Sequence, residues 1–266
     1  MPWFDASVLG LIQGLTEFIP VSSSGHLILA REWLGMTPGA SDLGFDAVLQ
    51  LATSFAVLAY FRRDIAELAR WFFTKISGKP IGENQQTLWL ALAFGTIPAV
   101  LAGLLLESSM ETIFRSSTLV AWTLLVGAAL MFVADTFGKQ GKELSLKKGF
   151  IVGLFQILAL VPGISRSGAT ISGGLLVGLT REVAIRFSFL LSFPILFGSG
   201  LKKLLDLYQT GALSVLGLDL FLGSLIAFAS GLAAIHFLVK YLKHHNLSLF
   251  IWYRVALAAV ALLILQ

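Results

Sequence analysis

Two long apolar segments of this chain are each interrupted in the middle by a short run of proline, glycine and serine. The first extends from Gly10 to His26 and the second from Gly153 to Ala169. Identical residues occur at the same spacing in both: Gly10, Leu11, Gln13, Leu15, Ser22, Ser24 and Gly25 in the first, and Gly153, Leu154, Gln156, Leu158, Ser165, Ser167 and Gly168 in the second. Interrupted apolar segments at matching places in two halves of a chain are typical of a site inside a membrane protein.

The composition supports a membrane location. Hydrophobic residues make up 56% of the chain and charged residues only 13%, against about 25% charged residues in ordinary soluble domains. The absence of cysteine excludes disulfides and thiolate metal sites. The net charge of +4 does not require a nucleic-acid partner, because excess Lys and Arg in a membrane protein mostly reflects loop topology. We therefore expect an all-α integral membrane protein, one domain over residues 1–266, surrounded by membrane lipids.

Six apolar stretches are close to the roughly 20 residues that a spanning helix needs. They are residues 43–61, 87–106, 118–136, 183–201, 217–239 and 250–266. The two interrupted segments, residues 6–30 and 150–180, fit better as re-entrant helix–loop–helix elements. Such non-helical backbone is tolerated at membrane depth where it is buried in protein or lines a wet cavity.

This arrangement predicts an inverted-topology repeat, with repeat one at about residues 1–140 and repeat two at about 145–266. Each half has three spans, so the second half inserts upside down relative to the first. Most Lys and Arg residues fall in the segments 62–86, 137–149 and 240–249, which share one side in this arrangement. The positive-inside rule assigns that side to the cytoplasm. Both termini then lie outside.

Ionisable residues within apolar segments are costly and are therefore candidates for function. Glu17 follows Gln13 by one helical turn, so the two side chains share a face. The serine-rich turn before His26 suits a helix N-terminus, where free N–H groups bind phosphate. In the second segment Arg166 adds a guanidinium, which binds phosphate oxygens in a bidentate manner.

These residue types indicate phosphoryl chemistry on a lipid. A hydroxyl of Ser22, Ser23 or Ser24, or a water molecule, is a candidate nucleophile, and His26 or Glu17 is a candidate proton carrier. Arg166 would stabilise charge on the transferred group. Gln13 and Glu17 are alternatively candidate ligands for a hard divalent cation.

Three motifs resemble the signatures of the undecaprenyl-diphosphatase family of the bacitracin-resistance type. They are Gln13-Gly-Leu-Thr-Glu17, Pro20-Val-Ser-Ser-Ser-Gly-His26 and Pro162-Gly-Ile-Ser-Arg-Ser-Gly-Ala-Thr170. The resemblance implies a bacterial inner-membrane phosphatase with a site facing the periplasm or exterior. It would convert undecaprenyl diphosphate to undecaprenyl phosphate and inorganic phosphate, recycling the lipid carrier for peptidoglycan and conferring resistance to bacitracin.

The same resemblance implies roles for individual residues. Glu17, His26 and Arg166 would be essential, and Ser23 would be the favoured nucleophile. The residues expected around the phosphate are Ser22, Ser24, Ser165, Ser167 and Thr170. The family also implies Mg²⁺ or Ca²⁺, but this chain has Gln13 at the first acidic position of the paired motif, and an amide is a weaker ligand for a hard cation than a carboxylate.

Other interpretations remain open from the sequence. A transporter or flippase for a lipid phosphate or anion would also use interrupted helices and Arg166, but it has little need of a Ser–His–Glu cluster. Glu17 and Arg166 would alternatively form a structural ion pair, and the serines would only cap helices. The oligomeric state is left open, with a homodimer as one option.

Overall fold

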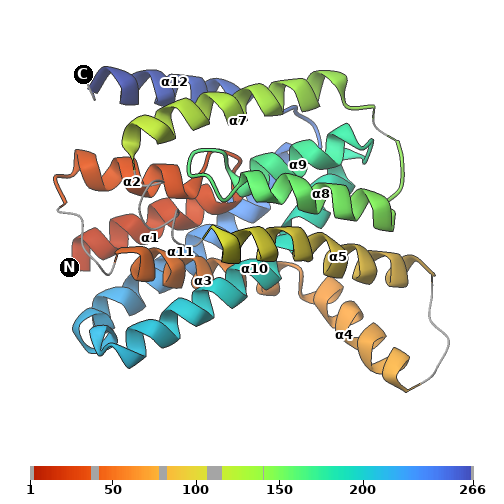
Figure 1. Ribbon diagram of the computed structural model, residues 1–266, viewed down its shortest axis with the longest axis horizontal. Helices are drawn as coiled ribbons and strands as arrows, with labels where there is room; N and C mark the ends of the chain where they lie inside the picture. The colour runs from red at the N-terminus through yellow and green to blue at the C-terminus, as the bar shows by residue number, and fades with distance from the viewer. Residues whose placement is uncertain (1–2, 37–41, 78–82, 107–115, 140, 265–266) are drawn as a thin grey trace.

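The structure is a computed structural model that describes residues 3–36, 42–77, 83–106, 116–139 and 141–264. The regular elements formed by these residues are α-helices (Figure 1). They are α1 (Trp3–Phe18), α2 (Ser23–Trp33), α3 (Asp42–Tyr60), α4 (Arg62–Ile76), α5 (Glu83–Leu105), α7 (Ser117–Phe137), α8 (Leu146–Leu158), α9 (Arg166–Leu176), α10 (Arg181–Gln209), α11 (Ala212–Tyr241) and α12 (Ser248–Ile264).

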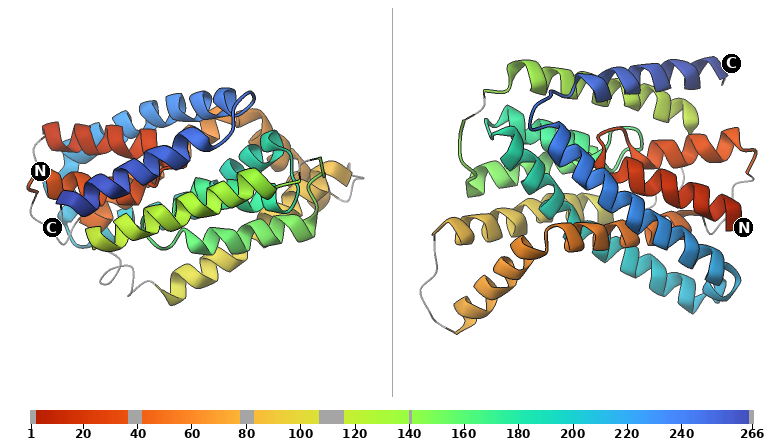
Figure 2. Two further views of the ribbon diagram at one scale, coloured as in Figure 1. Left: turned by 90° about the horizontal axis from the view of Figure 1, so that it is seen from above. Right: turned by 180° about the vertical axis from the view of Figure 1, so that it is seen from behind.

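Five helical segments are long and apolar enough to cross a membrane. They are Asp42–Tyr60, Gln86–Leu105, Ser117–Phe137, Arg181–Gln209 and Gly217–Tyr241. The sixth predicted span, residues 250–266, corresponds to the shorter apolar helix α12. The two ends of the chain lie at the same end of the molecule, and α4 lies at the other (Figures 1 and 2). This is the architecture of a helical multi-pass membrane protein.

Each interrupted segment forms two short helices joined by a tight turn. α1 contacts α2, and α8 contacts α9. The breaks occur where Ser22 and Ser165 adopt positive φ angles of 77° and 75°. Each serine is then the N-cap of the next helix, its Oγ accepting a hydrogen bond from the N–H of Gly25 or Gly168. The capping role weighed for the serines is therefore present at these two positions.

The segment 62–86, which is rich in Lys and Arg and lies between two predicted spans, contains a helix. α4 has charged residues such as Arg63, Glu67 and Arg70 on one face and apolar residues on the other. That pattern has a helical period, but the charges keep it below the hydropathy of a span. Its buried Trp71 stacks on Trp89 of α5, with ring centroids 4.9 Å apart.

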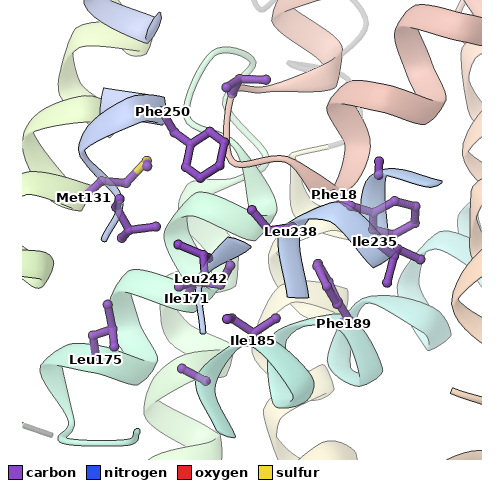
Figure 3. Close-up of a cluster of buried hydrophobic side chains, with 14 of the residues drawn as sticks. Phe18, Met131, Ile171, Leu175, Ile185, Phe189, Ile235, Leu238, Leu242 and Phe250 are labelled. Carbon is purple, nitrogen blue, oxygen red and sulfur yellow. The ribbon is translucent and has the colours of Figure 1, made fainter. Parts of the chain in front are cut away.

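The principal hydrophobic cluster lies beside the turns of the two interrupted segments (Figure 3). It joins α1, α7, α9, α10, α11 and α12 through Phe18, Met131, Ile171, Leu175, Ile185, Phe189, Ile235, Leu238, Leu242 and Phe250. Because interiors of this kind are closely packed, the cluster fixes the positions of helices that are far apart in sequence.

Glycines allow the first helix of each interrupted segment to approach a long helix closely. A Cβ on Gly10 of α1 would lie 2.3 Å from the carbonyl oxygen of Gly223 on α11. A Cβ on Gly153 of α8 would lie 2.1 Å from the carbonyl oxygen of Gly95 on α5. Small residues at such crossings are typical of membrane helices, where packing replaces the hydrophobic driving force.

Candidate functional site

The turns of the two interrupted segments meet in the interior. We call residues 19–22 the first tip and residues 159–165 the second tip. The N–H of Gly163 donates a hydrogen bond to Ser22 Oγ at 3.0 Å. Ser167 Oγ, just after the second tip, donates to the Ile19 carbonyl at 3.4 Å. The two turns therefore contact each other directly.

Glu17 is the centre of a buried polar cluster. Arg166 Nη2 lies 3.0 Å from Glu17 Oε1. On the other carboxylate oxygen, Glu17 Oε2 accepts hydrogen bonds from Ser23 Oγ at 2.6 Å and from Gln13 Nε2 at 2.8 Å. A hydroxyl in contact with a carboxylate, which a third group orients, is the arrangement of an activated nucleophile and its base.

Several polar atoms of this cluster are buried without a protein partner among the described residues. They include Arg166 Nε and Nη1 and Gln13 Oε1. Burial of unpaired polar atoms costs about 1–3 kcal/mol each, so such atoms are expected where a ligand supplies the missing bonds. The free guanidinium nitrogens suit an anion, and the amide oxygen suits a cation or a hydrogen-bond donor.

The other hydroxyl groups near the tips differ in position and in their hydrogen-bond partners. Ser24 Oγ lies 3.5 Å from Ser22 Oγ, and Ser165 Oγ lies 3.2 Å from Ser167 Oγ. Thr170 lies deeper, with its hydroxyl 2.5 Å from Ser188 Oγ of α10 and donating to the Arg166 carbonyl at 2.8 Å. The serines line the meeting point of the tips, whereas the Thr170 hydroxyl joins α9 to α10.

His26 belongs to the same turn but has other partners. Its Nδ1 lies 2.7 Å from the Ser22 carbonyl, and its Nε2 lies 2.8 Å from the Tyr253 hydroxyl. Because a carbonyl only accepts, we assign the proton of the neutral ring to Nδ1, and Nε2 then accepts from Tyr253. Ser23, by contrast, is hydrogen-bonded to Glu17.

Sequence reasoning missed two residues of α12 that reach this region, Tyr253 and Arg254. Arg254 is completely buried and hydrogen-bonds to backbone carbonyls of both tips. A signal for it was present, because an arginine within the predicted span 250–266 is expensive in a membrane. The predicted site residues Glu17, Ser23, Arg166 and Gln13 are in direct contact, and the catalytic roles assigned to them stay predictions.

The polar cluster around Glu17 supplies few oxygen ligands for a divalent cation. Among the described residues there is no group of three or more His, Cys, Asp or Glu side chains that would hold a metal ion. Mg²⁺ often keeps several waters and uses one or two carboxylates together with substrate phosphates. Glu17 and the unpartnered Gln13 Oε1 fit that mode, in which the substrate supplies part of the coordination.

The chain is similar to known proteins over nearly its whole length. The family described as bacitracin resistance protein BacA matches residues 6–260. An undecaprenyl-diphosphatase of Renibacterium salmoninarum is 41% identical over 100% of this chain and 96% of its own length. One from Paenarthrobacter aurescens is 42% identical over 97% of this chain and 95% of its own length. One from Mycobacterium ulcerans is 41% identical over 100% of this chain and 97% of its own length.

Proposed function

The chain belongs to the BacA family of bacitracin resistance proteins, and from that premise we propose that it is a membrane phosphatase that hydrolyses undecaprenyl diphosphate. The products are undecaprenyl phosphate and inorganic phosphate. The full-length similarity to proteins named undecaprenyl-diphosphatase supports this substrate. The activity recycles the lipid carrier for peptidoglycan and other envelope polymers, and it underlies resistance to bacitracin.

The proposed mechanism depends on the contact between Ser23 and Glu17. Ser23 Oγ attacks the terminal phosphorus while Glu17, 2.6 Å from that oxygen, accepts its proton. The bond to the bridging oxygen breaks, and undecaprenyl phosphate leaves. Water then attacks the phosphoserine, which releases inorganic phosphate and restores the hydroxyl. Glu17 is the better placed of the two candidate bases, because both ring nitrogens of His26 are engaged with Ser22 and Tyr253.

Arg166 holds the transferred phosphoryl group. Its Nη2 is engaged with Glu17, and its Nε and Nη1 are the donors that the protein leaves unpaired. The guanidinium thus orients the base through Nη2, while Nε and Nη1 each remain available to donate to a phosphate oxygen. Such preorganised charge is worth most in a buried, water-poor site. The nearby serine hydroxyls Ser22, Ser24, Ser165 and Ser167 complete the phosphate environment.

A divalent cation, Mg²⁺ or Ca²⁺, is part of the proposal. Glu17 and Gln13 would hold it together with the diphosphate. When bound, it would neutralise charge on the diphosphate. The protein contributes a single carboxylate here, so we expect the cation to bind weakly without substrate.

The site opens toward the outside of a bacterial inner membrane in this proposal. Six crossings and two re-entrant segments, arranged as inverted repeats, place both termini outside. The equivalent close approaches at Gly10 and Gly153 support the repeat relation. The common end of the two termini supports the even number of crossings (Figures 1 and 2).

Phosphate release by the purified protein in detergent tests the function, because no gradient exists there to drive transport. We expect the wild-type protein to release phosphate from undecaprenyl diphosphate and Ser23→Ala to lose at least about a hundredfold in kcat. Ser199→Ala is the matched control, since that hydroxyl donates to the Leu196 carbonyl of its own helix, α10. Wild-type protein that binds the lipid without releasing phosphate would instead indicate a transporter or flippase.

A further inference from the structure

Arg254 lies on α12, which packs against α7 at one edge of the molecule (Figures 1 and 2). The side chain is 0% exposed. A buried arginine in a membrane helix is expensive and is retained where it meets a specific need. The partners of its guanidinium indicate what that need is.

The guanidinium donates to carbonyls from three separate parts of the chain. Its Nη1 donates to Pro20 O of the first tip at 3.2 Å and to Ile164 O of the second at 2.9 Å. Its Nη2 donates to Gly163 O of the second tip at 2.6 Å. The remaining bonds reach α7, from Nε to Leu124 O at 3.1 Å and from Nη2 to Thr123 O at 3.5 Å. The five N–H donors of an arginine are thereby matched with carbonyls of α7 and both tips.

α7 is shaped to receive this side chain. A Cβ on Gly127 would lie 2.0 Å from Arg254 Nη2 and 2.7 Å from Ile164 O. One turn earlier, Thr123 Oγ1 donates to Pro162 O of the second tip at 2.5 Å. The absence of a side chain at Gly127 therefore leaves the space that the guanidinium and the second tip share.

Fixing the carbonyls also fixes the opposite edges of the same peptide groups. In a planar trans peptide, C=O and N–H point in opposite directions. With Ile164 O turned toward Arg254, the N–H of Ser165 points away from it, at the start of the helix that carries Arg166. The direction of that N–H and the path of the chain into Arg166 thus depend on the bond to Arg254.

We propose that Arg254 is a positioning residue for phosphoryl transfer: it joins the two tips through their carbonyls and so keeps Arg166 in register with Glu17 and Ser23. The inference rests on the proposed phosphatase function. Arg254 needs no contact with the substrate in this role. Its loss affects the geometry of the reacting groups more than the binding of the lipid.

Two variants disturb this contact in different ways. Arg254→Lys keeps a positive charge but lacks the planar fork that spans both tips. Gly127→Ala keeps Arg254 and displaces its guanidinium with one methyl group. Leu207→Ala is the control, a core truncation in a separate cluster that includes no residue of either tip.

The measurements are kcat and KM for phosphate release from undecaprenyl diphosphate, and amide hydrogen exchange of the two tips by mass spectrometry. We expect both variants to lower kcat by about a hundredfold, the cost of a displacement on the order of 1 Å, with a smaller change in KM. Amide exchange should accelerate at both tips and should not change in the helices. Leu207→Ala should leave kcat and tip exchange close to those of the wild type.

Undiminished kcat with unchanged tip exchange in either variant would refute the positioning role. So would faster exchange throughout the chain, which would make Arg254 a general stability residue. If Arg254→Lys does not fold, Gly127→Ala decides the question by the same measurements. If the wild type releases no phosphate, the proposed function is refuted, and tip exchange still tests whether Arg254 joins the tips.

Discussion

The side chains at this site differ in how completely they are hydrogen-bonded. Glu17 receives donors from Gln13, Ser23 and Arg166, so its orientation does not depend on any single bond. Arg166 is different, because two of its nitrogens have no protein acceptor among the described residues. A buried, charged and incompletely paired group is a candidate for substrate binding. We therefore expect binding and turnover of the substrate to depend strongly on Arg166.

Arg166→Ala should therefore lower kcat/KM for phosphate release by on the order of 10²- to 10³-fold, comparable with the loss of a key electrostatic donor. Arg166→Lys should recover only part of that loss, because an ammonium cannot orient Glu17 and bind two phosphate oxygens through one planar group. Steady-state kinetics in detergent measure both effects. Full activity of the lysine variant would show that a point charge is sufficient there.

The helices position these side chains through close backbone contacts. α1 and α8 each begin an interrupted segment, and each meets a long helix at a glycine pair. Neither contact has room for a methyl group unless the backbones separate. The tips lie at the ends of these two helices, so a change in either crossing is transmitted to the site.

Gly10→Ala and Gly153→Ala should each destabilise the protein by about 1–3 kcal/mol, the usual cost of overpacking. Gly198→Ala is the matched control within a helix, because a Cβ at that position meets no atom of the described residues within 4 Å. Because alanine has a higher helix propensity than glycine, the stability of Gly198→Ala should be unchanged or higher by up to about 1 kcal/mol. Thermal unfolding in detergent measures all three variants. Equal melting temperatures for all three would show that the glycine pairs are not tight in solution.

The complete molecule brings together segments from both halves of the chain. α1 packs on α11, and α8 packs on α5, so neither half forms its own compact unit. α4 and the described segments that follow α7 and α11, which are rich in Lys and Arg, lie toward the end opposite the two termini (Figures 1 and 2). That asymmetry of charge is what orients a membrane protein during insertion.

Single-cysteine labelling tests this orientation, since the natural chain has no cysteine. A membrane-impermeant maleimide applied to intact spheroplasts should label Thr210→Cys, which we place outside. It should label His244→Cys only after the membrane is opened. Both positions are exposed, so access to the side chain is not limiting. Labelling of both from the same side would contradict the proposed topology.

The helical membrane architecture and the two breaks were predictable from local features of the sequence. Apolar stretches of sufficient length indicate the spans, and the runs of proline, glycine and serine after Phe18 and Leu158 favour the end of one helix and the cap of the next. A helix such as α4 was missed because its charges lower its hydropathy, although its period is helical. Hydropathy, helix ends and helical period depend on residues that are close together in the sequence, so they can be predicted from it.

The detailed site depended on packing between distant segments. Glu17 and Arg166 are 149 residues apart, and their contact exists because the tips meet in the core. The same packing pairs Ser23, rather than His26, with Glu17 and brings Tyr253 and Arg254 from α12 to the tips. Hydropathy specifies which segments enter the membrane. Which donor meets which acceptor there is decided by how the helices pack, since buried polar groups pair with whatever the tertiary structure brings within reach.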